Sequence, residues 1–120
     1  SEFAVWSMEL VDRMNRRGVP IGAGTDTPIG YALPGYSLHT ELEFLVEAGL
    51  TPLEALHAAT VRPTEFFSLE ESMGTLDVGK VADMVLLNAN PLENISNTRQ
   101  INLVISKGMV LKPEILLSSK

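Results

Sequence analysis

The 120-residue sequence is 45% hydrophobic and has a formal net charge of −6, which favours a globular domain with a core and argues against a phosphate-backbone partner. It contains no cysteine, which excludes disulfide bonds, thiolate metal ligands and a cysteine nucleophile. No apolar run approaches the ~18 residues of a membrane span and no basic, apolar signal sequence opens the chain, so we expect a cytoplasmic protein that contacts neither membranes nor nucleic acid.

The chain is predicted to begin with a helix and a buried strand. Residues 1–3, Ser-Glu-Phe, are typical of an expression-tag remnant because they lack an initiating methionine. Apolar residues at spacings of three and four predict an amphipathic helix over 4–17, and Gly18 suits the position after its last turn. The run 19–24 is apolar on both faces, as is typical of a parallel strand covered by helices. This alternation favours an α/β fold.

Two further helices are expected after a loop. The segment 27–35 contains two prolines and two glycines, which we interpret as a loop. An apolar stripe then predicts a helix over 37–48. The pattern Thr-Pro-Leu-Glu from Thr51 is that of a capping box and starts a second helix. We expect that helix to end near Arg62, because the residue before a proline disfavours the helical conformation, with a short helical turn following through 66–67.

The pattern changes after Ser72, where turn residues and short apolar runs predict β-structure. Three short strands are predicted with no helix between them: 82–87, 101–106 and 109–111. Beyond the tag remnant we therefore expect three parts: an α/β part over 4–72, a β part over 73–112 and a loosely held tail over 113–120.

Asp26 is the leading candidate for chemistry because it follows the predicted strand 19–24. Parallel sheets place functional groups at the carboxyl ends of their strands, although a turn aspartate can also serve only to bond nearby loop amides. His39 and His57 are the only histidines, and they lie on different predicted helices, so they make no helical metal pair. His39 lies just after the loop, where ligands often bind, but a lone helical histidine can equally be a packing residue. The acidic residues of the helix 37–48, which we interpret as its solvated face, are Glu41, Glu43 and Glu47.

Three stretches together resemble the C-terminal third of amidohydrolase-superfamily enzymes: GVPIGAGTDTP, SLHTELEFLVEAGLTPLEALHAAT and MGTLDVGKVADMVLLNANPLENI. The resemblance extends over about 5–111 and is nearest to the imidazolonepropionase-like and Xaa-Pro dipeptidase-like branch. It implies a (β/α)8 barrel with a metal centre at the carboxyl ends of its strands, together with a small composite β-sandwich. The chain would then be a C-terminal fragment that supplies the final barrel strand, 19–24, the helices around it and short strands of the sandwich.

The resemblance also implies a site. Asp26 matches the family's strand-eight aspartate, which ligates the metal and takes the proton of the attacking water. His39 matches a histidine of the family's HxEL helix, which implies a substrate-side role. The implied cofactor is a divalent metal, with zinc as the favoured ion. The implied substrate is a small molecule with a cyclic-amide or dipeptide-like C–N bond.

The family's other metal-site residues have no counterpart in this sequence. Its His-x-His pair, bridging lysine and two later histidines belong to earlier barrel strands, so the resemblance implies a fragment that is inactive alone. Such a fragment is expected to self-associate through apolar faces that its missing neighbours would cover. Two alternatives remain open, a non-catalytic binding or assembly module derived from the same fold and a deaminase of the same superfamily.

Overall fold

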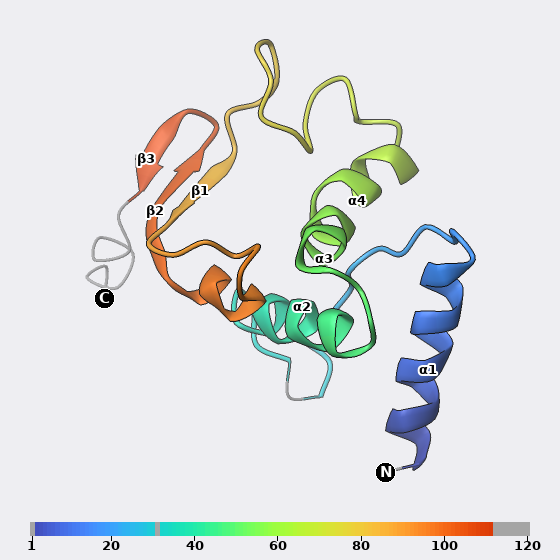
Figure 1. Ribbon diagram of the computed structural model, residues 1–120. Coiled ribbons are helices and arrows are strands. Elements are labelled where there is room, and N and C mark those ends of the chain that lie inside the picture. The colour runs from blue at the N-terminus through green and yellow to red at the C-terminus, as the bar shows by residue number, and fades with distance from the viewer. Residues whose placement is uncertain (1, 31, 112–120) are drawn as a thin grey trace.

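The computed structural model describes residues 2–30 and 32–111, so residue 1 of the expected tag remnant and the expected tail, 113–120, lie outside the described residues. Helices make up the first half of the chain and strands follow in the last third (Figure 1). The elements are α1 (Glu2–Arg16), α2 (Ser37–Glu47), α3 (Pro52–Ala59), α4 (Val61–Phe66), β1 (Met84–Leu87), η1 (Ile95–Arg99), β2 (Ile101–Ser106) and β3 (Met109–Leu111). This order confirms the expected mixed α/β class. In the described part, no helix is long and apolar enough to cross a membrane.

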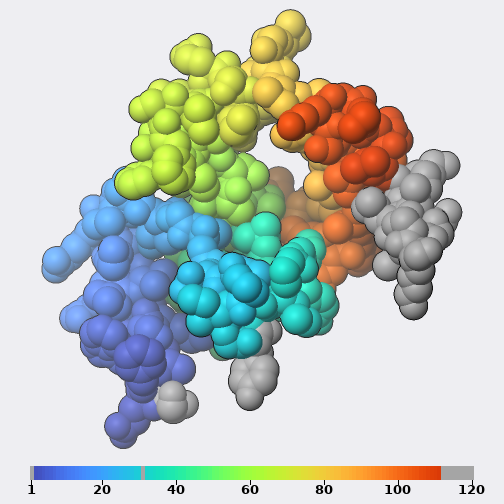
Figure 2. All heavy atoms as spheres, turned by 180° about the vertical axis from the view of Figure 1, so that it is seen from behind, coloured from blue at the N-terminus to red at the C-terminus, as the bar shows by residue number. Residues whose placement is uncertain are grey.

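The helices and the sheet are arranged as an open arc. Figure 1 shows α2 and α3 beside each other, with α1 on one side of them and the sheet on the other. In the space-filling view an opening lies between the sheet and the helical part (Figure 2). The radius of gyration is 15.4 Å, whereas a closely packed domain of this length is expected to have about 13.6 Å. The arrangement therefore leaves much apolar surface uncovered.

Helices α2 and α3 form where the sequence predicts them. Gly49 follows α2 with a φ of 109°, a left-handed conformation that glycine adopts readily, so the helix ends there. At the start of α3 the Thr51 Oγ1 accepts a hydrogen bond from the Glu54 N–H at 3.2 Å. The Glu54 Oε2 in turn accepts from the Thr51 N–H at 2.7 Å, which completes the predicted capping box.

The expected helix end near Arg62 is wrong. Helix α3 already ends at Ala59, and α4 begins at Val61 after a break at Thr60, whose φ and ψ are −126° and −65°. Pro63 lies inside α4, but only in its first turn. The first N–H groups of a helix have no acceptor within the helix, so a proline there removes no hydrogen bond.

The segment 19–24 is not the strand that the sequence predicts. It is irregular, and among residues 2–30 and 32–111 its one backbone–backbone hydrogen bond to a distant element runs from the Ala23 N–H to the Ala58 carbonyl, at 2.8 Å. A strand needs a ladder of bonds to a neighbour, and within the described residues the three strands pair only with one another. Apolar composition alone therefore did not suffice to make a strand here.

The three predicted strands form one antiparallel sheet with the order β1–β2–β3. Strands β2 and β3 have the predicted bounds, and β1 begins two residues later than predicted. The expectation of no helix between the strands is wrong, because the 3₁₀ helix η1 precedes β2. Its start is fixed by Asn94, whose side chain accepts a hydrogen bond from the Ser96 N–H at 3.0 Å.

The buried core lies between α2, α3 and η1. Its members are apolar residues that are less than one-tenth exposed: Leu42, Leu45, Leu50, Ala55, Ala58 and Ile95. Helix α1 has no buried residue, and its Phe3 and Trp6 are 74% and 57% exposed. The core thus joins the helical part to η1, the segment between β1 and β2, and leaves α1 at its margin.

Candidate functional site

Asp26 occupies an exposed turn at the end of the irregular segment. Its φ of 52° is in the left-handed region, which aspartate tolerates better than most residues. Its carbonyl accepts a hydrogen bond from the Ile29 N–H at 2.9 Å, and the hydroxyls of Thr25 and Thr27 bond to each other at 2.6 Å. Within residues 2–30 and 32–111, no hydrogen bond or ion pair joins the Asp26 carboxylate to the protein. The structure therefore leaves this anion open to an outside partner.

The acidic residues of α2 are not one solvated face, as the sequence suggested. Glu41 and Glu43 are half-buried and Glu47 is exposed. The Glu41 Oε1 accepts a hydrogen bond from the Gly24 N–H at 3.2 Å, and Glu43 forms an ion pair with Arg99 at 3.0 Å. The interpretation as a solvated face is wrong for Glu41 and Glu43, because each has a partner far away in the sequence.

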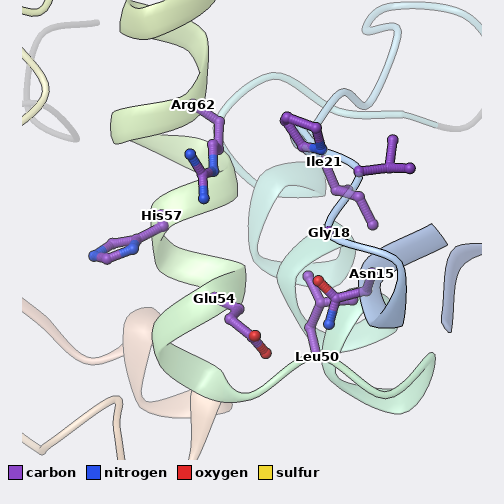
Figure 3. Close-up of a pocket in the computed structure, with 9 residues that line it drawn as sticks. Asn15, Gly18, Ile21, Leu50, Glu54, His57 and Arg62 are labelled. Carbon is purple, nitrogen blue, oxygen red and sulfur yellow. The ribbon is translucent and has the colours of Figure 1, made fainter. Parts of the chain in front are cut away.

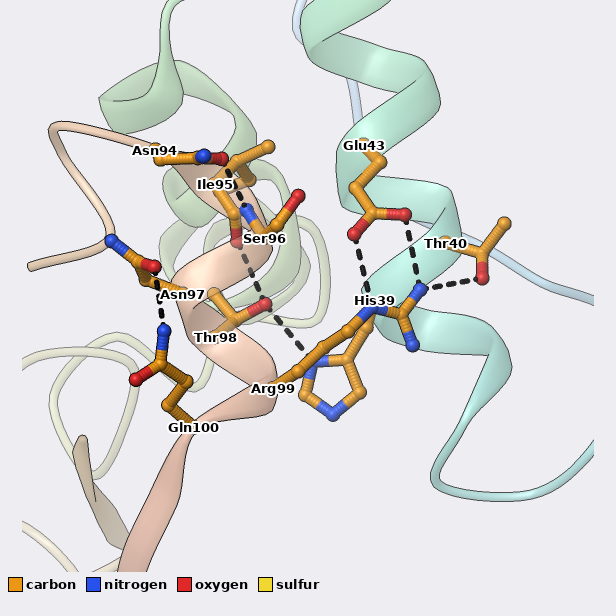
Figure 4. A network of polar contacts seen from close by, with 10 residues as sticks. All are labelled: His39, Thr40, Glu43, Asn94, Ile95, Ser96, Asn97, Thr98, Arg99 and Gln100. Carbon is orange, nitrogen blue, oxygen red and sulfur yellow. Dashed lines mark hydrogen bonds and ion pairs between the residues drawn. The ribbon is translucent and has the colours of Figure 1, made fainter. Parts of the chain in front are cut away.

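His39 lies in the first turn of α2, where its ring bonds to η1 (Figure 4). Its Nδ1 is 3.0 Å from the Thr98 Oγ1, and that hydroxyl donates its single proton to the Ile95 carbonyl at 2.9 Å. The hydroxyl can then only accept from His39, so Nδ1 carries the ring proton and Nε2 keeps a lone pair. Burial lowers the pKa of His39, as does the charge of Arg99, while Glu43 acts in the opposite direction. The ring is therefore held neutral near pH 7.

Arg99 joins η1 to α2 through a bidentate ion pair with Glu43 (Figure 4). Its Nε and Nη2 donate to the two carboxylate oxygens of Glu43, each at 3.0 Å, and Nη2 also donates to the Thr40 Oγ1 at 2.9 Å. The guanidinium lies over the Tyr36 ring, 4.6 Å from its centre. The hydrogen bonds from Arg99 hold the pKa of Glu43 below its ordinary value. Sequence reasoning missed this junction because its two ions are 56 positions apart.

A pocket of about 170 Å³ lies near the start of the irregular segment, not at its Asp26 end (Figure 3). Residues 18–21 line it, together with the polar side chains of Asn15, Glu54, His57 and Arg62. Neither Asp26 nor His39 belongs to its lining. The pocket and the predicted site are therefore separate features.

The described residues do not form a metal centre by themselves. Among residues 2–30 and 32–111, no group of three or more histidine, aspartate or glutamate side chains gathers closely enough to hold a metal ion. A catalytic metal usually takes three protein ligands and keeps one open position. Asp26 offers one unpartnered carboxylate, so the described part of the chain fits a single ligand of such a site and not the whole of it.

Comparisons with known proteins place these residues in a family. Residues 7–111 match the amidohydrolase family. The chain is 43% identical over 82 residues to the ochratoxinase of Aspergillus niger, covering 67% of this chain and 16% of that protein. It is 36% identical over 107 residues to the imidazolonepropionase of Pyrobaculum arsenaticum, covering 85% of this chain and 26% of that protein.

The fold is also similar to that of a solved enzyme. The crystal structure of a Xaa-Pro dipeptidase with bound methionine in its active site superposes with a TM-score of 0.80 and 27% identity. The superposition covers 88% of this chain and 25% of that chain. This chain therefore spans about a quarter or less of the length of the proteins that it resembles. The family match extends over most of the 120 residues, and the chain belongs to the amidohydrolase family.

Proposed function

We propose that this chain supplies one part of a hydrolase that cleaves C–N bonds in cyclic-amide or dipeptide-like substrates, with Asp26 as metal ligand and general base. The observation that carries this proposal is the exposed carboxylate of Asp26, which has no partner among residues 2–30 and 32–111 and lies in a left-handed turn inside the stretch that matches the amidohydrolase family. A carboxylate in this state is free to bind a cation and to accept a proton, which are the two roles proposed for it.

The metal in this proposal is a divalent ion, and zinc is the ion that we favour. When bound, it would act as a Lewis acid and make a water molecule nucleophilic near neutral pH. Because no group of three or more possible ligands gathers among the described residues, the other ligands would come from protein outside them. The chain by itself should then be inactive and retain well under one metal ion per molecule after dialysis, and a stoichiometric metal would overturn this part of the proposal.

The proposed substrate class rests on the relatives. One is called a Xaa-Pro dipeptidase and was crystallised with methionine in its active site, which supports a substrate built from amino acids. Another is called an imidazolonepropionase, and an imidazolone ring contains a cyclic amide. In this chain His39 would face such a substrate with Nε2, the nitrogen that its bond to Thr98 leaves unprotonated.

We further propose that 4–72 forms the last units of a (β/α)8 barrel and that 73–112 contributes strands to a composite sandwich. The uncovered apolar side chains of α1 support this organisation, because a neighbouring barrel unit would bury them. In the isolated chain the same side chains should drive self-association. Light scattering that shows a monomer at high protein concentration would contradict the self-association.

The decisive experiment compares Asp26→Asn with a matched control, Glu47→Gln, in the full-length protein encoded by the gene. Both substitutions replace one exposed carboxylate by its amide. Asp26→Asn should lower the rate of hydrolysis of Xaa-Pro dipeptides or cyclic amides by a factor on the order of 10³ or more, because the general base and a metal ligand are lost together. Glu47→Gln should leave the rate unchanged. Full activity of Asp26→Asn would refute the proposed role.

A second candidate, a non-catalytic binding or assembly module, is favoured by one observation, the lack of a three-ligand group among the described residues. The coding sequence upstream of Ala4 separates the two candidates. A His-x-His motif some hundreds of residues earlier is expected for the hydrolase. A start codon at this point is expected for the module, and Asp26→Asn should then have no functional effect.

A further inference from the structure

The two residues just before the Asp26 turn are tied to two different helices. The Ala23 N–H donates to the Ala58 carbonyl of α3 at 2.8 Å. The next N–H, that of Gly24, donates to the Glu41 Oε1 of α2 at 3.2 Å. Adjacent amides thus clamp the segment between α3 and α2, two residues before Asp26.

The two hydrogen bonds differ in their acceptors, which are a backbone carbonyl and a side-chain carboxylate. The one to Ala58 is a backbone bond, so it depends on where α3 lies and not on its side chains. The one to Glu41 depends on a single half-buried carboxylate that reaches across 17 positions of sequence. Glu41 is therefore the side chain whose identity can set the path of the chain into the turn.

Nothing else in the described part of the protein holds the Asp26 side chain in place. Its carboxylate has no partner there, and the bonds within its turn, from Ile29 and between Thr25 and Thr27, are local. Local bonds fix the shape of a turn but not its position relative to the helices. That position depends on the two bonds at Ala23 and Gly24 and on the packing of Ile21 and Ala23 against the core.

We propose that Glu41 is a positioning residue for Asp26, acting through the Gly24 amide to fix where the carboxylate projects. This inference rests on the proposed function of Asp26. Removal of Glu41 should leave the chain folded, because the core residues and the Ala23–Ala58 bond remain. The turn should then move relative to α2, and displacements of about 1 Å can lower turnover by roughly 100-fold.

Amide hydrogen exchange on the full-length protein tests the clamp without an activity measurement. In Glu41→Ala the Gly24 amide should exchange about tenfold faster, whereas Ala55 in the buried helix should keep its protection. Glu41→Gln keeps a carbonyl acceptor and should restore most of the Gly24 protection. Glu47→Ala, on the same helix but exposed, should change neither amide. Unchanged Gly24 exchange in Glu41→Ala would overturn the inference, as would equal loss of protection at Ala55.

Steady-state kinetics of the full-length protein test the consequence for Asp26. Glu41→Ala should lower kcat roughly 10- to 100-fold with little change in KM, and Glu41→Gln should recover most of kcat. If Glu41 served only folding, Glu41→Ala and Glu41→Gln would both contain less active protein, and to the same extent. Faster Gly24 exchange with unchanged kcat would refute the positioning role. If Asp26→Asn were also fully active, the proposed function would fail as well, so the two failures are distinguishable.

Discussion

The Asp26 turn and the junction between α2 and η1 differ in whether their charged side chains have bonding partners. At the junction, Arg99 donates two hydrogen bonds to the Glu43 carboxylate and His39 is bonded to Thr98. At the turn, the Asp26 carboxylate has no partner within the described residues, and its backbone adopts a left-handed conformation. Charges that stabilise a fold are paired, whereas a charge left unpaired at a strained position is a candidate for function.

Helix α2 takes part in both regions. One side of α2 packs Leu42 and Leu45 into the core, and its half-buried acids reach to η1 and to the irregular segment. Helix α2 is therefore the element that connects the predicted site to the sheet. Substitutions at the junction should change stability, and substitutions at the turn should change function.

The largest effect on stability is expected from Arg99→Ala. The substitution leaves the half-buried Glu43 without its partner and removes a bond to Thr40, so it should lower the midpoint of urea denaturation. Arg62→Ala is the matched control, because its pair with Glu65 is more exposed and should contribute about 0–0.5 kcal/mol. Urea denaturation of both variants measures the difference. Equal midpoints would show that the junction does not stabilise the fold.

A smaller, pH-dependent effect is expected from His39. Its pKa is lowered in the folded protein, first by burial and then by Arg99, against the opposing charge of Glu43, so the unfolded chain binds the proton more readily. The stabilising contribution is complete above about pH 6.5 and is lost as the pH falls through the lower pKa of the folded protein.

The variant His39→Asn tests this dependence. An asparagine can still donate an N–H to the Thr98 hydroxyl but does not titrate. The wild type should lose stability between pH 7.5 and 5.5, and the variant should lose less, as measured by urea midpoints at both values. His57→Asn replaces the other, exposed histidine and should behave as the wild type. Identical pH dependence in all three proteins would exclude His39 as the source.

Local sequence patterns predicted the elements whose causes are local. The capping box at Thr51 needs only a threonine and a glutamate three residues apart, and the structure has it. Strands 101–106 and 109–111 follow from apolar runs around a turn at Lys107-Gly108. The segment 19–24 failed as a strand because strand formation requires a neighbour, which no local pattern specifies.

The candidate site shows the same difference between features with local causes and features that depend on distant residues. Asp26 could be singled out from its place after an apolar run, and the order of three stretches indicated its family. The partners of Glu41 and Glu43 could not be predicted, since Gly24 and Arg99 reach α2 only through the tertiary fold. An acidic stripe on a helix has the same sequence whether its charges face water or a partner.

A very small effect on stability is expected from Asp26→Asn, in contrast to Arg99→Ala. Because the carboxylate has no partner within the described residues, Asp26→Asn should change the free energy of unfolding by no more than about 0.5 kcal/mol, and asparagine also tolerates a positive φ. Asp26→Ala should cost about 1 kcal/mol, because a left-handed conformation is unfavourable for alanine. The two variants thereby separate the carboxylate from the backbone that presents it. A loss of stability in Asp26→Asn as large as that in Arg99→Ala would mean that the carboxylate serves the fold, and its assignment to catalysis would lose its support.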